Sequence, residues 1–294
     1  MAAVASPAQA MSRASPPRKP VDPFRAGQYV MLVVVVLAAD LPLLFMILSA
    51  FRTEAANKQY PPSVDADTLT LDNFTSLFGT YGFGQYLQNS LVVSGLATAG
   101  VVILGTIAAY ALSRFDFLPL RVMGRLAIVA YLVPPILILV PVTQVIFGAG
   151  LGDNLIALAA LYTAVFLPFA LWMLRSYFQG VAIQLEEAAM VDGCTRFGAF
   201  RRVVIPISVP GVITAAIFTF AAAWSEYLYA STLMTSTSNL TANPATYLLM
   251  GHYGTTSAGL LMAAGLVIVA PVVVLYLVAQ RWLVSGLAAG AVKG

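Results

Sequence analysis

Charged side chains are scarce in this sequence of 294 residues, and so are the residues that carry most metal and thiol chemistry. Asp, Glu, Lys and Arg make up 9% of the chain, against about a quarter in an average soluble domain. There is one cysteine, Cys194, and one histidine, His252. The chain therefore cannot form an internal disulfide framework or a Cys/His metal cluster, and we expect no metal site and no cofactor.

Other patterns are missing as well. The sequence has no Gly-rich phosphate loop of the Walker type, so the chain does not supply such an ATP site itself. Apolar and polar residues do not alternate with period two, which argues against a membrane β-barrel. The net charge is +3, but the basic residues are spread along the chain. We therefore expect no nucleic acid as a partner.

Long hydrophobic runs dominate what is present. Hydrophobic residues make up 60% of the chain, and the mean hydropathy is +0.87. A bilayer span needs about 20 mostly apolar residues. We predict an all-α membrane protein with six transmembrane helices at residues 29–50, 90–112, 126–147, 154–174, 210–234 and 257–283. These spans form one transmembrane domain over residues 29–284.

The residues before the first span form a Pro-rich, basic segment, 1–28, which we predict to be a disordered tail. Such a tail either only fixes the orientation of the chain or binds anionic lipid through its basic residues. The first hydrophobic run is as long as a full span and no small-residue cleavage site follows it. We interpret it as a retained helix and not as a secretory signal.

The basic residues predict the orientation of the spans. All but two of the 15 Lys and Arg residues fall on one side of the six spans, and the exceptions are Arg52 and Lys58. Cytoplasmic loops carry the excess of Lys and Arg in membrane proteins. We therefore place both termini and the long loop after the fourth span, 177–209, in the cytoplasm. The loop 235–256 then lies outside, where it either touches a partner protein or is simply solvated.

One polar stretch in the loop 177–209 is the most informative part of the sequence. Good helix formers run from Leu185 to Val191, with two acids near the start, where the helix dipole favours them. Two alanines present little bulk, so that a partner surface can approach closely. We predict a short helix between spans four and five, followed by Gly193, which suits a helix end.

The spacing of this stretch resembles the signature loop of ATP-binding-cassette importer permeases: Glu187-Ala188-Ala189, three residues, Gly193, nine residues, then Val203-Val204-Ile205-Pro206. In that family the loop docks into the ATPase subunit. The resemblance implies that this role falls on Glu186, Glu187, Ala188, Ala189, Asp192, Gly193 and Pro206. Further similar segments are Phe51-Arg52-Thr53 and Asn89-Ser90-Leu91.

The C-terminal segment, 285–294, is similar to the ending of the smaller permease of maltose-type carbohydrate importers. The resemblance implies a cytoplasmic tail whose Gly290, Lys293 and Gly294 contact the ATPase. It also implies a bacterial inner-membrane complex with carbohydrate as solute. Its other members are a second, different permease, two copies of an ATPase and an external solute-binding protein.

Two acids lie within predicted spans, where a charge is costly and usually functional. Glu226 follows Trp224 in the fifth span, and both residues are candidates for the solute pathway. The alternative for Glu226 is a packing hydrogen bond to a Ser or Tyr of a neighbouring helix. Asp40 either caps a helix kinked at Pro42 or contacts solute. Prolines in the spans, such as Pro134 and Pro135, can kink the helices.

The predicted function is the permease half of an ATP-driven importer that works by alternating access. The alternative is a self-contained ion-coupled transporter, which normally needs several intramembrane acids or a histidine relay. Asp40 and Glu226 are the only acids within the predicted spans. An intramembrane enzyme would need a convergent set of reactive groups. We therefore do not expect the chain to be an enzyme.

Overall fold

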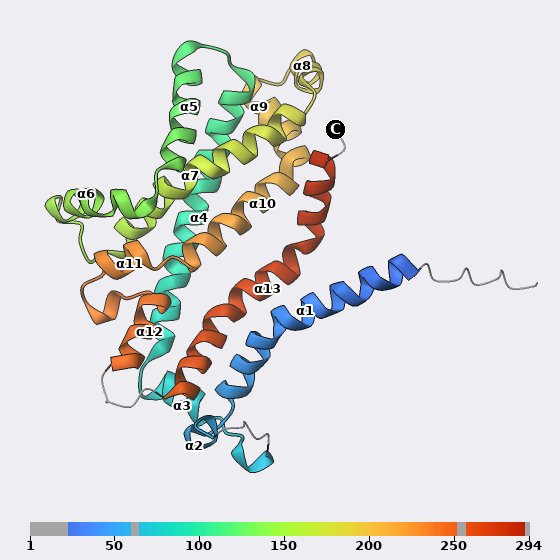
Figure 1. Cartoon of the computed structure of the whole chain (residues 1–294). Coiled ribbons are helices and arrows are strands. Elements are labelled where there is room, and N and C mark those ends of the chain that lie inside the picture. The colour runs from blue at the N-terminus through green and yellow to red at the C-terminus, as the bar shows by residue number, and fades with distance from the viewer. Residues whose placement is uncertain (1–22, 60–64, 252–256, 292–294) are drawn as a thin grey trace, which may run out of the picture. The chain divides into compact units, whose positions relative to one another are not determined.

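The computed structural model describes residues 23–59, 65–251 and 257–291, and the chain divides into two units, 1–45 and 46–294. Helix α1 (Pro23–Ala50) begins in the first unit and runs unbroken across Pro42. It starts within the segment that we predicted to be a disordered tail, so that residues 23–28 are helical. The second unit holds the remaining helices (Figure 1).

The second unit is helical in the residues described. Its helices are α2 (Glu54–Asn57), α3 (Asp72–Gly79), α4 (Phe83–Arg114), α5 (Leu118–Leu132), α6 (Pro135–Gly148), α7 (Leu155–Gly180), α8 (Ile183–Val191), α9 (Arg196–Ala199), α10 (Ile205–Trp224), α11 (Leu228–Leu233), α12 (Ala242–Gly251) and α13 (Ala258–Ala291). A π-helix, Phe200–Val204, joins α9 to α10. Over the described residues of the whole chain, with α1 included, five helical segments are long and apolar enough to cross a membrane, or six with one bent pair, by length and composition.

Helix α4 forms the axis of the packing in this unit. It contacts α7 most extensively and α10 next, and α10 also packs on α13 (Figure 1). Three clusters of buried side chains follow α4 along its length. Small residues allow the close approach of these helices: a Cβ added to Gly211 of α10 would lie 2.4 Å from the ring of Tyr177 of α7. Such close packing drives helix association in lipid.

The third predicted span, 126–147, is not one straight helix. Helices α5 and α6 meet at Val133 and Pro134 with a bend of 106°, so that they form either a broken span or a re-entrant loop. Two consecutive prolines, Pro134 and Pro135, remove two backbone donors, and Val133 is extended, as a residue before proline prefers. Helices α6, α7 and α13 continue across single prolines. The tandem pair is therefore what breaks this segment.

The fifth predicted span, 210–234, was wrong at both ends. Helix α10 starts earlier, at Ile205, and stops at Trp224, and the separate helix α11 begins at Leu228. Only two polar residues, Ser225 and Glu226, interrupt the hydrophobic pattern at this point. The Glu226 side chain accepts hydrogen bonds from the Tyr229 and Ala230 amides in the first turn of α11. Amides in the first turn of a helix have no partner within the helix, so that this carboxylate stabilises the new helix start.

The other spans are confirmed as helices, but several are longer than predicted. Helix α4 begins at Phe83 and not at residue 90, and α7 extends to Gly180. Helix α13 continues to Ala291, so that most of the predicted tail, 285–294, is helical. Polar residues near a helix end lower the local hydrophobicity without ending the helix, and a hydropathy window therefore cuts the prediction short.

Asp153, between α6 and α7, ties two connecting segments together. Its φ of +54° lies in the left-handed region, which Asp and Asn tolerate better than most residues. Its Oδ1 accepts hydrogen bonds from the Thr235 and Ser236 amides at 2.9 and 3.0 Å. Its carbonyl oxygen accepts one from Asn239 Nδ2 at 2.8 Å. The turn before α7 is thereby fastened to the segment after α11.

We expect Asp153→Ala to lower the free energy of unfolding by about 2 kcal/mol, because two amides lose their acceptor and alanine is strained at this φ. Asp153→Asn keeps an oxygen acceptor, and asparagine also tolerates a positive φ. It should therefore lower the free energy of unfolding much less than Asp153→Ala does. Denaturant unfolding of the detergent-solubilised protein measures both. Equal losses in the two variants would contradict this role.

The same contact predicts a pH dependence. Hydrogen bonds from Ser236 hold the pKa of Asp153 below its ordinary value. A lowered folded-state pKa contributes stability that is present above the unfolded-state pKa and is lost as the pH falls through the folded-state pKa. The advantage of the wild type over Asp153→Asn should therefore shrink as the pH falls below about 4.

Candidate functional site

The acidic stretch predicted to be a short helix forms α8, and its local sequence explains its limits. Helix α8 begins after Ala182, which is extended, and ends at Val191, with Asp192 as its C-cap. Gly193 follows with a φ of +90°, which favours glycine. Thr195 then caps α9, because its hydroxyl oxygen accepts a hydrogen bond from the Gly198 amide at 3.1 Å. Two short helices are thus set by a glycine turn and a threonine cap.

The first acid of this stretch, Glu186, turns into the protein. It is 4% exposed and forms an ion pair with Arg114 at the end of α4. Its Oε2 also accepts a hydrogen bond from the Tyr110 hydroxyl at 2.9 Å. Arg114 Nη2 in turn donates to the Val181 carbonyl at 3.0 Å. The start of α8 is therefore fixed to α4. The sequence had predicted Glu186 on a surface that contacts a partner protein, but its side chain is buried.

Aromatic side chains continue this junction. The ring of Tyr110 lies 4.3 Å from that of Phe200 and 6.4 Å from that of Phe178, measured between centroids. The Arg196 guanidinium lies over the ring of Phe115 at 5.3 Å, a distance at which cation–π attraction acts. These contacts join α4, the end of α7 and the start of the π-helix. The ion pair and the rings together make a rigid base under α8 and α9.

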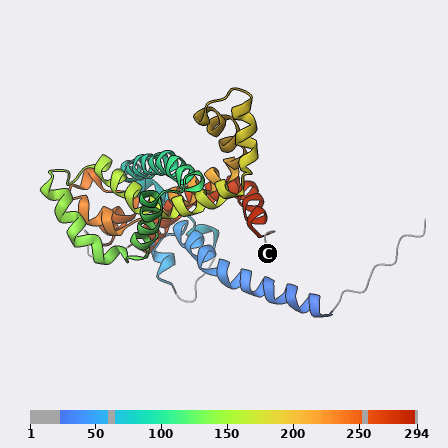
Figure 2. The ribbon, with the colours of Figure 1, turned by 90° about the horizontal axis from the view of Figure 1, so that it is seen from above.

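The opposite side of α8 and α9 is exposed. Glu187, Ala188 and Asp192 face outward. Two large apolar side chains lie beside them, Val191 at 87% exposure and Phe197 at 69%. Seen from above, α8 and α9 stand out beside the packed helices (Figure 2). Exposed apolar side chains that lie together in this way can mark a surface for contact with a partner, which makes this face of α8 and α9 the candidate site.

Glu226 and Trp224 lie at the break between α10 and α11. Glu226 accepts hydrogen bonds from the Tyr229 and Ala230 amides at 2.9 and 3.1 Å. It also accepts one from the hydroxyl of Tyr162 on α7. The packing hydrogen bond that we weighed for Glu226 is therefore present. Buried Trp224 donates from Nε1 to the Ile268 carbonyl at 2.9 Å, which links α10 to α13.

The sequence missed the capping role of Glu226 and the partner of Glu186. Glutamate is not among the residues that usually signal a helix start, and apolar residues lie on both sides of Ser225 and Glu226. Arg114 and Glu186 are 72 residues apart, and no local pattern links them.

The remaining predicted site residues are dispersed. Asp40 is exposed on α1, which continues past Pro42 without a break. Pro206 is exposed in the first turn of α10. Gly290 lies near the end of α13, and Lys293 and Gly294 lie outside the described residues. Within the described ranges, no group of three or more His, Cys, Asp or Glu side chains is placed to hold a metal ion.

Comparisons with known proteins identify the family of the chain. Residues 101–288 match the family described as binding-protein-dependent transport system inner membrane component. The chain is 34% identical over 279 residues to the inner membrane ABC transporter permease protein YcjP of Escherichia coli (strain K12), covering 92% of this chain and 97% of that protein. It is 35% identical over 228 residues to the trehalose transport system permease protein SugB of Mycobacterium tuberculosis (strain CDC 1551 / Oshkosh), covering 77% and 83%.

A solved structure has the same fold. It is the crystal structure of a bacterial ABC transporter involved in the import of the acidic polysaccharide alginate, and one of its chains superposes with a TM-score of 0.76 at 19% identity. The superposition covers 91% of this chain and 99% of that one. The resemblance inferred from the sequence is thereby confirmed. The chain belongs to the family of binding-protein-dependent transport system inner membrane components, whose members are permease subunits of ABC transporters.

Proposed function

We propose that this chain is one of two permease subunits of an ATP-driven carbohydrate importer. The observation that carries the proposal is the exposed surface of α8 and α9, with Glu187 and Asp192 outward and Glu186 anchored inward. A flexible acidic loop would bend when a partner pushed on it. Because a buried ion pair ties α8 to α4, a displacement of α8 by a partner would be passed to α4.

The proposed assembly follows from the family. It contains a second, different permease, two copies of an ATPase and an external solute-binding protein. Both termini and α8 face the cytoplasm, since the basic residues gather at that end of the spans. Glu187, Ala188, Ala189, Asp192, Gly193 and Pro206 serve ATPase docking, and Glu186 holds α8 in place for it. Gly290, Lys293 and Gly294 contact the ATPase from the C-terminal segment.

Carbohydrate is the proposed solute class because SugB, a relative at 35% identity, is named for trehalose transport. The proposed mechanism is alternating access. ATP binding closes the ATPase pair, α8 follows, and the spans change from inward-open to outward-open. Hydrolysis resets them. The ATPase pair then biases a two-state helix bundle to which it is docked, which is coupling in the thermodynamic sense.

A self-contained ion-coupled transporter is less well supported. It would use an intramembrane acid that gains and loses protons along the pathway. Glu226, at the break after α10, already accepts hydrogen bonds from three donors. Glu226 is therefore better suited to holding the break between α10 and α11.

The docking role is tested by Glu187→Lys. We expect the reversed charge to reduce retention of the ATPase on purification about tenfold, since like charges then face each other across the interface. ATP-dependent uptake of sugar should fall in parallel. Because Glu187 is exposed, the variant should reach the membrane at the wild-type level.

The matched control is Asp65→Lys, the same reversal at an exposed acid remote in sequence from α8. It should leave ATPase retention unchanged. Glu187→Gln, which only neutralises the charge, should fall between the wild type and Glu187→Lys. If Glu187→Lys retains the ATPase as well as the wild type does, α8 is not the docking surface.

A further inference from the structure

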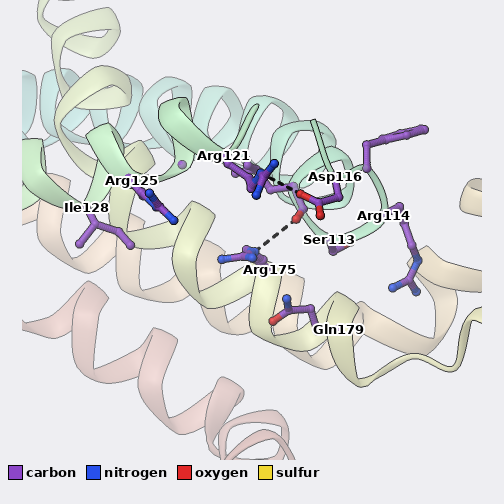
Figure 3. A pocket seen from close by; sticks show the side chains of 11 residues that line it. Ser113, Arg114, Asp116, Arg121, Arg125, Ile128, Arg175 and Gln179 are labelled. Carbon is purple, nitrogen blue, oxygen red and sulfur yellow. Dashed lines mark hydrogen bonds and ion pairs between the residues drawn. The ribbon is translucent and has the colours of Figure 1, made fainter. Parts of the chain in front are cut away.

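A cavity of about 480 Å³ opens between the end of α4, the first half of α5 and the last turns of α7. Its lining is unusually basic, with four arginines and one acid: Arg114, Arg121, Arg125, Arg175 and Asp116. Figure 3 shows Arg121, Arg125 and Arg175 around the same opening, whereas Arg114 lies apart from them. Helices α5 and α7 thus bring three guanidinium groups to the same opening.

Two of these charges are already neutralised. Arg114 is paired with buried Glu186, and Arg121 Nε lies 2.9 Å from Asp116 Oδ1. Arg125 and Arg175 have no carboxylate partner among the described residues. Arg175 Nε donates to the Leu112 carbonyl at 3.3 Å, which orients its guanidinium and leaves the terminal nitrogens for another acceptor. The cavity therefore keeps an excess of positive charge.

The chemistry of the lining fits a phosphate group. Arginine offers a planar fork of donors that matches phosphate oxygens, and two such forks can share one group. Gln179 adds an amide donor to the same lining, and Ile128 adds apolar surface beside it. The volume is also within the range of sites for small ligands.

The surroundings resemble the headgroup level of a bilayer. Apolar side chains of α5 next to the cavity are exposed, among them Leu118, Val122 and Met123. On α7, Trp172 lies one turn before Arg175 and is 56% exposed. Tryptophan beside arginine is typical of the membrane–water boundary. Basic pockets between transmembrane helices bind anionic headgroups.

We propose that this cavity binds a phosphate group through Arg125 and Arg175, with Arg121 beside them. The phosphate is supplied either by the headgroup of an anionic phospholipid or by a soluble phosphate compound. The site is separate from the docking surface of α8, and its occupancy does not depend on the proposed transport of carbohydrate.

The test uses the full-length chain purified with its co-purifying subunits, as wild type and as Arg125→Gln/Arg175→Gln. In the first arm, both are exchanged into phosphatidylcholine nanodiscs that contain phosphatidylglycerol, re-extracted in detergent, and the phosphatidylglycerol retained per complex is quantified by mass spectrometry. In the second arm, delipidated complex is titrated with inorganic phosphate at constant ionic strength, and the unfolding temperature is recorded.

A lipid source predicts that the wild type retains phosphatidylglycerol and that retention weakens roughly fivefold for each arginine removed. A soluble source predicts instead that inorganic phosphate raises the unfolding temperature of the wild type and not of the variant. Equal behaviour of wild type and variant in both arms would overturn the proposal.

Two further variants separate the site from general charge effects. Arg201→Gln/Arg202→Gln removes the same charge from exposed arginines outside the cavity lining, and it should bind lipid and phosphate as the wild type does. Arg125→Lys/Arg175→Lys keeps the positive charge but loses the planar guanidinium donors. Its affinity for phosphate should lie between those of the wild type and the Gln variant. A loss of binding in the Arg201/Arg202 variant as large as that in the Gln variant would contradict a discrete site.

Discussion

Replacing Arg114 by alanine is expected to lower the free energy of unfolding by about 3–5 kcal/mol, because the Glu186 carboxylate stays buried without its ionic partner. Glu186→Ala should cost a similar amount, since it strands the guanidinium. Tyr110 can still donate to Glu186 in the first variant, but one hydroxyl does not offset a lost charge. Such a loss is a large part of the stability of an ordinary domain.

A double-mutant cycle separates the pair from the packing around it. The double variant Arg114→Ala/Glu186→Ala should lose clearly less than the sum of the two single variants, because neither charge is then left alone. Urea unfolding in detergent, followed by tryptophan fluorescence, provides the energies. The matched control is Arg121→Ala, which breaks the exposed pair with Asp116 and should cost about 1 kcal/mol or less. Additive losses would show that the two side chains do not act as a pair.

Glu226→Ala is expected to lower the free energy of unfolding by about 3 kcal/mol or more. It removes the common acceptor of the Tyr229 amide, the Ala230 amide and the Tyr162 hydroxyl. Each buried donor left without an acceptor costs about 1–3 kcal/mol. We expect the start of α11 to fray and the contact between α11 and α7 to loosen.

Graded variants identify which bonds matter. Glu226→Gln keeps one oxygen and should lose less than half as much as Glu226→Ala, while Tyr162→Phe removes a single donor. Thermal unfolding of the three proteins ranks them, and hydrogen exchange at Tyr229 and Ala230 reports the cap directly. Asp40→Ala, at an exposed acid of α1, serves as the control and should change little. A Glu226→Ala protein with unchanged exchange at these amides would contradict the capping role.

The hydrophobic runs predicted the spans well because each is long and apolar, and length with hydropathy is what a bilayer selects. The interruptions were harder to predict. The bend at Val133 and Pro134 had a visible signal in two consecutive prolines. The break after Trp224 had none of comparable strength, since only Ser225 and Glu226 interrupt the apolar residues between α10 and α11. Only the hydrogen bonds of Glu226 show why the helix stops there.

The acidic loop shows the same limit at the level of single residues. Sequence spacing predicted the short helix α8 and the glycine turn after it, and both are present. It could not distinguish the two adjacent glutamates. Glu186 and Glu187 are identical in type, but successive positions on a helix point about 100° apart. One is therefore buried against Arg114 and the other exposed. Arg114, which pairs with Glu186 and not with Glu187, belongs to α4 and is distant in the sequence.

The attachment of α8 has a mechanical consequence. The chain joins it to α7, the Glu186–Arg114 pair joins it to α4, and α9 with the π-helix joins it to α10. A body held on three supports keeps few internal degrees of freedom. A load applied to it is shared among three helices and tilts them as a block instead of bending a loop. Loss of one of these attachments should let α8 move relative to the other helices. A displacement applied to α8 would then be passed only in part to α4, α7 and α10.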